Sequence, residues 1–556
     1  MPANVEVEDA FKDLRSFYRV GEAIEIVALP QRTARVMARK ASGRAVGATL
    51  GEKARFDSLG SGTYCVEALD ADGELVAEEF TTVGQHQGER PVHGFATSFG
   101  PDDIADVLAW HRALRSTVVQ IYDWMSSYTE PLGPTSGWKD PSSRPVSFDA
   151  LRTLASGLHD LGAVAHAYAP IYAVGNAFAA AHPEMLLYEG DGRAIRFLDQ
   201  IVLANPGNRE WQQHFADSYG LAMDAIGFDG LHVDTYGYPR VSYDANGNLV
   251  DIRAAYEAFL VYLRAERPSD LISFNQVNGV PSAIHIPDGP TFRYCEVWPP
   301  NDRWWHFEGL MDRSSGRAGL VGDFRARDPL LRGSIACYPP VWGIETPDDP
   351  ISGDERESAL RTVVCTEAIV TCLGGSSLIY GDVRAALCDP YYPKHVSLNE
   401  AEAEKVVAWR RFSLRCRDLF IEGEDTSWYE IGDENGSVAI LADAPVSPEP
   451  VGRSLFVRVN HGEEIVSIGV IDLTGNQNAK WSELTAAGKI SGVRARVLLD
   501  HPDTWRVDAA VLGSRNDRFF RIEPAIVSHR QGRALEMDLP LVEGWSVLRL
   551  TKERRV

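Results

Sequence analysis

The sequence predicts a multidomain α/β protein in which a central (β/α)8 TIM barrel is flanked by an N-terminal immunoglobulin-like domain and a C-terminal β-sandwich. The chain of 556 residues is too long for a single hydrophobic core. Short runs of alternating apolar and polar residues occur near both ends, and between them strand-like segments alternate with amphipathic helix-like segments. That central alternation is typical of βα units and a parallel sheet. We therefore expect domains at residues 1–90, 91–425 and 426–556.

The first domain is indicated by residues 62–83, GTYCVEALDADGELVAEEFTTV. Tyr64, Val66 and Ala68 alternate with other residues, DADGE supplies a turn, and a second alternating run follows. This is the pattern of a β-hairpin. It predicts a small β-sandwich of immunoglobulin type.

The barrel is indicated by eight short apolar segments with helix-like stretches between many of them. The expected strands are residues 93–99, 116–124, 162–170, 230–236, 271–277, 292–298, 332–340 and 376–382. The expected helices include residues 101–115, 209–227, 252–267 and 355–375, whose apolar residues recur at helical spacing. Eight such strands predict a (β/α)8 barrel with insertions.

The C-terminal domain is expected after a helix over residues 399–420. From there the alternating pattern returns, for example in GRSLFVRVN and GWSVLRLTK. This predicts a second β-sandwich.

Composition excludes some classes of partner. The chain has 55 basic and 78 acidic residues and a net charge of −23, so it would repel the phosphate backbone of a nucleic acid. No run of eighteen apolar residues suits a membrane span. Neutral substrates remain open, and the sequence does not indicate an oligomeric state.

The seven cysteines form no CxxC pair and lie mostly in apolar runs, which is typical of reduced thiols. The first twenty residues are acidic and lack the apolar segment of a signal peptide. We therefore expect a cytoplasmic protein, with secretion as the alternative if a leader precedes this sequence.

Two acidic residues are the candidate catalytic groups. In GLHVDTY, period-two alternation places Leu231 and Val233 toward the helices and His232 and Asp234 toward the barrel interior. The same phasing in FRYCEVW points Glu296 inward, and both acids fall at strand ends where barrel active sites are built. Taken singly, each has an ordinary explanation as a cap or turn residue. Together they predict the pair of carboxyl groups that glycosidic cleavage requires.

Other strand ends carry side chains suited to a sugar. Aromatic faces stack on pyranose rings, while Asp, Asn and Gln bind hydroxyl groups. A metal held by His166, His232 and Asp234 is conceivable, but no histidine spacing here resembles a zinc motif, so we expect neither metal nor cofactor. The expected substrate-binding residues are Tyr122, Asp123, Trp124, Tyr168, Tyr172, His232, Asn275, Trp298, Asp382 and Tyr391.

These same segments carry a family resemblance. The stretches QIYDWM, AYAPIYA, GFDGLHVDTYG, FNQVNG, YCEVWP and LIYGD...YYP resemble, in this order, glycoside hydrolase family 66, which contains dextranases and cycloisomaltooligosaccharide glucanotransferases. GFDGLHVD alone is only moderately specific, because α-amylase-type enzymes carry a related motif. The combination is far more selective.

The resemblance implies a retaining, endo-acting enzyme on α-1,6-linked glucan, with Asp234 as nucleophile and Glu296 as acid/base. Only about fifteen residues lie between the seventh strand and its helix, which favours hydrolysis over cyclisation. The expected substrate is dextran or an isomaltooligosaccharide. A transglycosylase and a non-catalytic oligosaccharide-binding protein are the alternatives.

Overall fold

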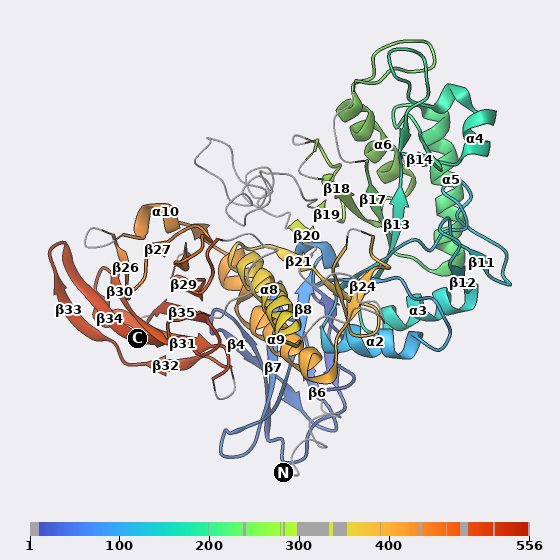
Figure 1. Ribbon diagram of the computed structural model, residues 1–556. Helices are drawn as coiled ribbons and strands as arrows, with labels where there is room; N and C mark the ends of the chain where they lie inside the picture. The colour runs from blue at the N-terminus through green and yellow to red at the C-terminus, as the bar shows by residue number, and fades with distance from the viewer. Residues whose placement is uncertain are drawn as a thin grey trace.

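The protein is described from a computed structural model, shown in Figure 1. The described residues are 11–197, 199–236, 241–277, 280–281, 284–296, 333–336, 353–389, 391–432, 436–462, 464–478, 488–514 and 517–553. Within them, no helix combines the length and the apolar composition that crossing a bilayer requires. The predicted multidomain α/β architecture is confirmed. The boundaries near residues 90 and 425 stay a prediction.

Two antiparallel-rich sheets form the N-terminal part, coloured blue in Figure 1. A five-stranded sheet has the order β1-β8-β7-β3-β4, and a three-stranded sheet has the order β2-β6-β5. Buried residues of both sheets, such as Ile24, Val36 and Val66, belong to one core. The elements are β1 (Phe17–Arg19), β2 (Ile24–Ile26), β3 (Arg35–Lys40), β4 (Ala45–Gly47), β5 (Thr49–Leu50), β6 (Ala54–Phe56), β7 (Gly62–Leu69), β8 (Leu75–Gly84) and η1 (Gln87–Glu89).

The central sheet has the order β21-β20-β19-β18-β17-β13-β10-β9-β22-β23-β24. All neighbours from β21 to β9 pair in parallel, and β22 pairs in parallel with β9. Each of the eight predicted strands overlaps one of these segments, the last being divided into β21 and β22. The parallel strands are β9 (His93–Ala96), β10 (Val118–Ile121), β13 (Val164–Pro170), β17 (Gly230–Asp234), β18 (Leu271–Asn275), β19 (Thr291–Glu296), β20 (Gly333–Ala336), β21 (Ser376–Leu378) and β22 (Tyr380–Gly381).

Helices cover this sheet, and α5 illustrates how the sequence specifies them. Asn208 caps its N-terminus by accepting the Trp211 backbone N–H at 3.0 Å, and Gly227 ends it in the left-handed conformation. Among the described residues, the helices of this central part are α2 (Ile104–Ala113), α3 (Phe148–Asp160), α4 (Asn176–Ala181), η2 (Pro183–Met185), α5 (Arg209–Ile226), α6 (Ile252–Glu266), α8 (Gly353–Cys372) and α9 (Glu400–Ile421), whereas α10 (Ser427–Glu430) lies against β28 of the C-terminal part.

Small hairpins extend the loops of the central sheet. The antiparallel pair β11–β12 follows β10, a three-stranded sheet of order β14-β16-β15 follows β13, and β23 and β24 extend β22. Their bounds are β11 (Trp138–Lys139), β12 (Pro145–Val146), β14 (Ala173–Val174), β15 (Arg196–Phe197), β16 (Ile201–Leu203), β23 (Ala385–Leu387) and β24 (His395–Ser397).

Two further sheets form the C-terminal part, coloured red in Figure 1, with α8 and α9 between it and the central strands. One runs β25-β28-β29-β35-β31-β32 with β27 beside β28, and the other runs β26-β30-β34-β33. They share a core of aliphatic side chains. The elements are β25 (Glu424–Asp425), β26 (Val438–Leu441), β27 (Val446–Ser447), β28 (Leu455–His461), β29 (Ile465–Asp472), β30 (Gly492–Leu498), η6 (Pro502–Thr504), β31 (Trp505–Val511), β32 (Phe520–Ile522), β33 (Ala525–His529), β34 (Gly532–Pro540) and β35 (Trp545–Lys552).

Candidate active site

The two predicted acids lie at the ends of nearly adjacent parallel strands. Asp234 is the last residue of β17, Asn275 is the last residue of β18, and Glu296 is the last residue of β19. Carboxyl ends of parallel strands share one edge of a sheet, so the three side chains are brought together there. Gly230 allows this close strand packing, since a Cβ at that position would lie 2.1 Å from the Leu271 carbonyl oxygen.

Asn275 connects the two acids through a single nitrogen. Its Nδ2 donates to Asp234 Oδ1 at 2.7 Å and to Glu296 Oε2 at 2.8 Å. Its Oδ1 accepts the Glu296 backbone N–H at 3.1 Å, which fixes the orientation of the amide. The two carboxylate oxygens are therefore separated by no more than the sum of the two donor distances, about 5.5 Å.

Asp234 receives a second side-chain hydrogen bond from Tyr168. The phenol donates to Asp234 Oδ2 at 2.8 Å. Burial raises the pKa of Asp234 to about 6, and the hydrogen bonds from Tyr168, Asn275 and the Thr235 backbone limit this rise. Burial is the main cause that raises the pKa of Tyr168 well above its usual range, and the nearby charge of Asp234 adds to it. The phenol therefore keeps its proton and stays a hydrogen-bond donor.

Tyrosine rings surround this pair of acids. Tyr122 lies between Tyr168 and Tyr392, with ring centroids 4.5 Å from each, and Tyr391 packs edge-on at 6.1 Å. Tyr122 and Tyr391 are half-buried, whereas Tyr168 and Tyr392 are buried. The Tyr392 hydroxyl is hydrogen-bonded to the Tyr294 hydroxyl. Apolar ring faces next to carboxylates are a combination suited to a sugar.

Asp123 is a third acidic residue close to this group. It follows β10 with a φ of 49°, in the left-handed region that non-glycine residues seldom occupy. Burial raises its pKa to about 7; Arg144 opposes the rise, and the charges of Asp140 and Asp234 add to it. Arg144 and Asp140 pair at 2.7 Å across the β11–β12 hairpin. The sequence reasoning missed that pair, although its spacing of four residues around a Pro-Ser-Ser turn is a recognisable signal.

His232 and Tyr172 lie deeper in the protein. The His232 Nδ1 is 2.9 Å from the Ser273 hydroxyl, and burial lowers the pKa of this histidine well below its usual value, so the ring is neutral. Its ring packs edge-on against Tyr294 at 4.4 Å and parallel to Tyr168 at 6.1 Å. Tyr172 is buried with its ring 6.0 Å from that of Tyr236.

Trp124 has different surroundings from those expected. Trp124 is fully buried against Tyr219 and Phe228, and its contact with the substrate stays a prediction. Period-two phasing does not extend to Trp124, because β10 ends at Ile121 and Asp123 is in the left-handed conformation.

Asp382 braces the loop after β9. Its carboxylate accepts the backbone N–H of Thr97 at 2.6 Å and of Ser98 at 3.1 Å, and also the Thr97 hydroxyl. His395 Nδ1 lies 3.4 Å from the same carboxylate. Trp298, the remaining predicted site residue, lies outside the described residues.

Comparison with known proteins gives the class of the molecule. The fold is similar to that of a solved cycloisomaltooligosaccharide glucanotransferase from Paenibacillus sp. complexed with cycloisomaltoheptaose, with a TM-score of 0.78 and 17% identity over 98% of this chain and 99% of that one. The model of glycosyl hydrolase family 66 matches residues 57–545. The chain belongs to this family, which confirms the prediction from the sequence motifs.

Curated relatives carry two names. A cycloisomaltooligosaccharide glucanotransferase from Niallia circulans is 27% identical over 297 residues, which are 46% of this chain and 30% of that protein. A dextranase from Streptococcus salivarius is 23% identical over 420 residues, 66% of this chain and 49% of that protein. The chain thus spans only about a third to a half of the length of these relatives.

Proposed function

We propose that the protein is a retaining, endo-acting glycoside hydrolase that cleaves α-1,6-glucosidic linkages in dextran or isomaltooligosaccharides. The observation that carries the proposal is the Asn275 amide, whose Nδ2 binds both acids and so limits the distance between Asp234 Oδ1 and Glu296 Oε2 to at most about 5.5 Å. Retaining glycosidases hold their two carboxyl groups about 5–5.5 Å apart, whereas inverting ones need about 6.5–9.5 Å. Family membership and the names of the relatives support the choice of linkage.

The proposed scaffold is a closed (β/α)8 barrel. The eighth strand supports closure because β21 pairs with β20, β22 pairs with β9, and one residue, Ile379, lies between the two segments. Asp234, Asn275 and Glu296 would then stand at the carboxyl-terminal rim, where barrel enzymes build their sites. We keep 1–90, 91–425 and 426–556 as the proposed domains.

In the proposed reaction, Glu296 donates its proton to the glycosidic oxygen while an Asp234 oxygen attacks the anomeric carbon. The bond to the leaving sugar breaks and a glycosyl ester of Asp234 forms. Glu296, now ionised, removes a proton from water, and the resulting hydroxide displaces Asp234 to release a sugar of unchanged configuration. Tyr168 and Asn275 favour the ionised Asp234 that the first step needs.

The proposed substrate contacts are the half-buried tyrosine rings and the buried acid beside them. Tyr122 and Tyr391 would stack against the sugar, and Asp123 would bind a hydroxyl group. We propose His232 and Tyr172 as positioning residues beneath them, because both are buried. Trp298 remains part of the proposal from sequence alone.

The decisive experiment combines a substrate panel with two acid variants. We expect the protein to cleave α-1,6-glucan, and not α-1,4- or α-1,3-glucan, with the α-anomer as first product by NMR. Asp234→Asn and Glu296→Gln should each lower kcat/KM by at least about 10³-fold. Asp229→Asn, at the opposite end of the same strand, is the matched control and should retain activity. A first-formed β-anomer, or full activity in Asp234→Asn, would refute the assignment.

Glucan transfer is the second candidate, and the names of the glucanotransferase relatives favour it. The two reactions share the glycosyl ester and differ in whether water or a sugar hydroxyl receives the glycosyl group. Products formed at high oligosaccharide concentration separate them: longer or cyclic saccharides indicate transfer, and shorter linear ones indicate hydrolysis. Tight binding of oligosaccharide without any turnover would instead support a non-catalytic binding protein.

A further inference from the structure

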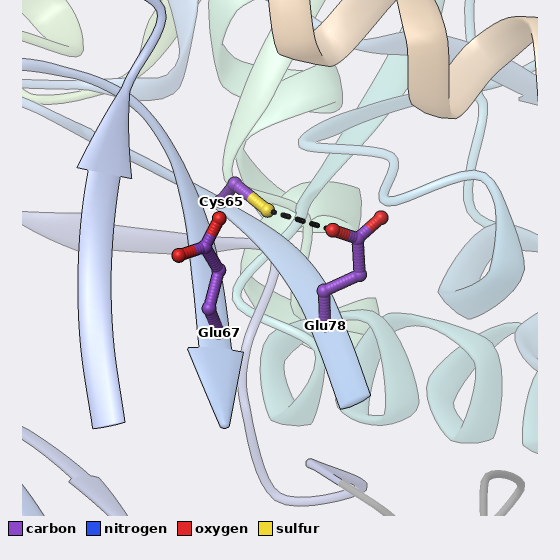
Figure 2. Close-up of side chains that lie close together, drawn as sticks. All are labelled: Cys65, Glu67 and Glu78. Atoms are coloured by element: carbon purple, nitrogen blue, oxygen red, sulfur yellow. Dashed lines mark hydrogen bonds between the residues drawn. The ribbon is translucent and has the colours of Figure 1, made fainter. Parts of the chain in front are cut away.

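A cluster of ionisable side chains lies where the N-terminal sheet, α9 and the C-terminal sheet meet. Cys65 and Glu67 are two residues apart on β7, and Glu78 lies on the neighbouring β8; Figure 2 shows all three side chains together. Their ligand atoms all lie within 4.8 Å of one another, which resembles a ligand set for a cation.

Arginines already neutralise this acidic cluster. Arg518 donates to Glu67 at 2.7 Å, and Arg39 binds the other oxygen of Glu67 at 3.2 Å. Arg415 is hydrogen-bonded to Glu78. Burial raises the pKa of Cys65 well above its usual range, so its thiol is protonated and a poor metal ligand. The surroundings therefore argue against a bound cation.

The same arginines line a pocket of about 250 Å³ beside the cluster. Among the described residues, six cationic side chains line it, and the carboxylates of Glu67, Glu78 and Asp508 are hydrogen-bonded to them. The charges of Asp517 and Glu553 also act on Arg415 and Arg506. The pocket thus has an excess of positive charge in a chain whose net charge is −23. The lining cations are Arg39, Lys40, Arg415, Arg506, Arg518 and Arg549.

Two buried arginines at this pocket, Arg549 and Arg415, have unused hydrogen-bonding capacity. Arg549 is 5% exposed, and its terminal nitrogens donate to Asp508 at 2.8 Å and to the Ala41 carbonyl at 2.6 Å. Among the described residues, neither its Nε nor the Nε of the buried Arg415 has a hydrogen-bond partner. Burial lowers the pKa of Arg549; Asp508 opposes this effect, and the charges of Arg506 and Arg39 add to it.

We propose that this pocket binds a small, multiply charged oxyanion, namely a phosphate group that is either free or carried by a small metabolite. Guanidinium groups bind phosphate oxygens through paired N–H donors, and several can converge on one anion. The anion would neutralise the excess charge and connect β3 and β7, α9 and the C-terminal strands β31 and β35. This site is distinct from the proposed sugar site and independent of its chemistry.

The test is isothermal titration of the full chain in Tris buffer at constant ionic strength, with inorganic phosphate, glucose 6-phosphate and sodium chloride as separate titrants. We expect saturable one-to-one binding of a phosphate compound and none of chloride. The tighter of the two phosphates identifies the source. Arg518→Gln, whose side chain is 27% exposed, should weaken binding about tenfold through loss of one charged hydrogen bond.

Arg521→Gln is the matched control. This exposed arginine lies three residues after Arg518, pairs with Glu523 and does not line the pocket. If Arg518→Gln fails to fold by circular dichroism, Arg506→Gln, with a side chain 45% exposed, replaces it. Absence of saturable phosphate binding, or equal affinity in the pocket variant and the control, would overturn the proposal. So would saturable Zn²⁺ binding that Glu78→Gln abolishes, because this would assign the cluster to a cation.

Discussion

Replacing Tyr168 by phenylalanine tests the electrostatics of the proposed nucleophile. The substitution removes the 2.8 Å hydrogen bond to Asp234 and keeps the ring between Tyr122 and His232. A hydrogen bond to a charged group contributes about 1.5–3 kcal/mol, and one pKa unit corresponds to about 1.4 kcal/mol. Because the bond stabilises the ionised form, its loss should raise the pKa of Asp234 from about 6 by about one to two units.

The assay is the pH dependence of kcat/KM on an isomaltooligosaccharide. Asp234 must be ionised to attack, so activity falls as the pH drops through its pKa. With a rise of one unit, Tyr168→Phe should lose about a hundredfold in kcat/KM at pH 5 relative to its own plateau, against about tenfold for the wild type, and keep about nine tenths of that plateau at pH 8. Tyr219→Phe, which removes a hydroxyl 3.4 Å from the Tyr128 carbonyl, is the control and should leave the profile unchanged. An acid limb of Tyr168→Phe that coincides with that of the wild type, or moves to lower pH, would refute the reasoning.

Three further substitutions probe the surroundings of the site. Asp123→Asn removes a carboxyl group whose pKa is about 7; kcat/KM should fall about 10–100-fold and lose one ionisation near neutrality, and an unchanged profile would contradict a role in binding. Asp382→Ala leaves buried donors of the loop after β9 unpaired and should cost about 3 kcal/mol, visible as a lower urea midpoint and faster amide exchange in that loop. Gly230→Ala would force its new Cβ against the Leu271 carbonyl, so thermal unfolding should occur at lower temperature and activity should fall; wild-type stability would disprove the close packing of β17 and β18.

Local periodicity predicted much of the central sheet. Each expected strand overlaps an observed segment, because buried parallel strands are short apolar runs between helices. Period-two phasing also predicts that Asp234 and Glu296 point to the same site. In the structure both end regular strands and bind the same Asn275 nitrogen. The same reasoning does not reach Trp124, which follows a left-handed residue where period two no longer applies.

Contacts between distant segments could not be predicted in this way. The basic pocket joins Arg39 to Arg549, and its charge arises only when three parts of the chain pack together. The bridging role of Asn275 likewise depends on the register between β17, β18 and β19, which a single sequence does not specify. The sequence predicts that Asn275 contacts the sugar. In the structure, its amide is hydrogen-bonded to both Asp234 and Glu296.

The shared amide has a consequence for the timing of the proposed reaction. When Asp234 becomes an ester, it loses its negative charge and becomes a weaker hydrogen-bond acceptor. The Asn275 amide should then bind Glu296 more strongly than Asp234. This happens at the moment when Glu296 has given up its proton and carries the charge. The neutral Asn275 amide would thus stabilise the negative charge first on Asp234 and then on Glu296, without itself gaining or losing a proton.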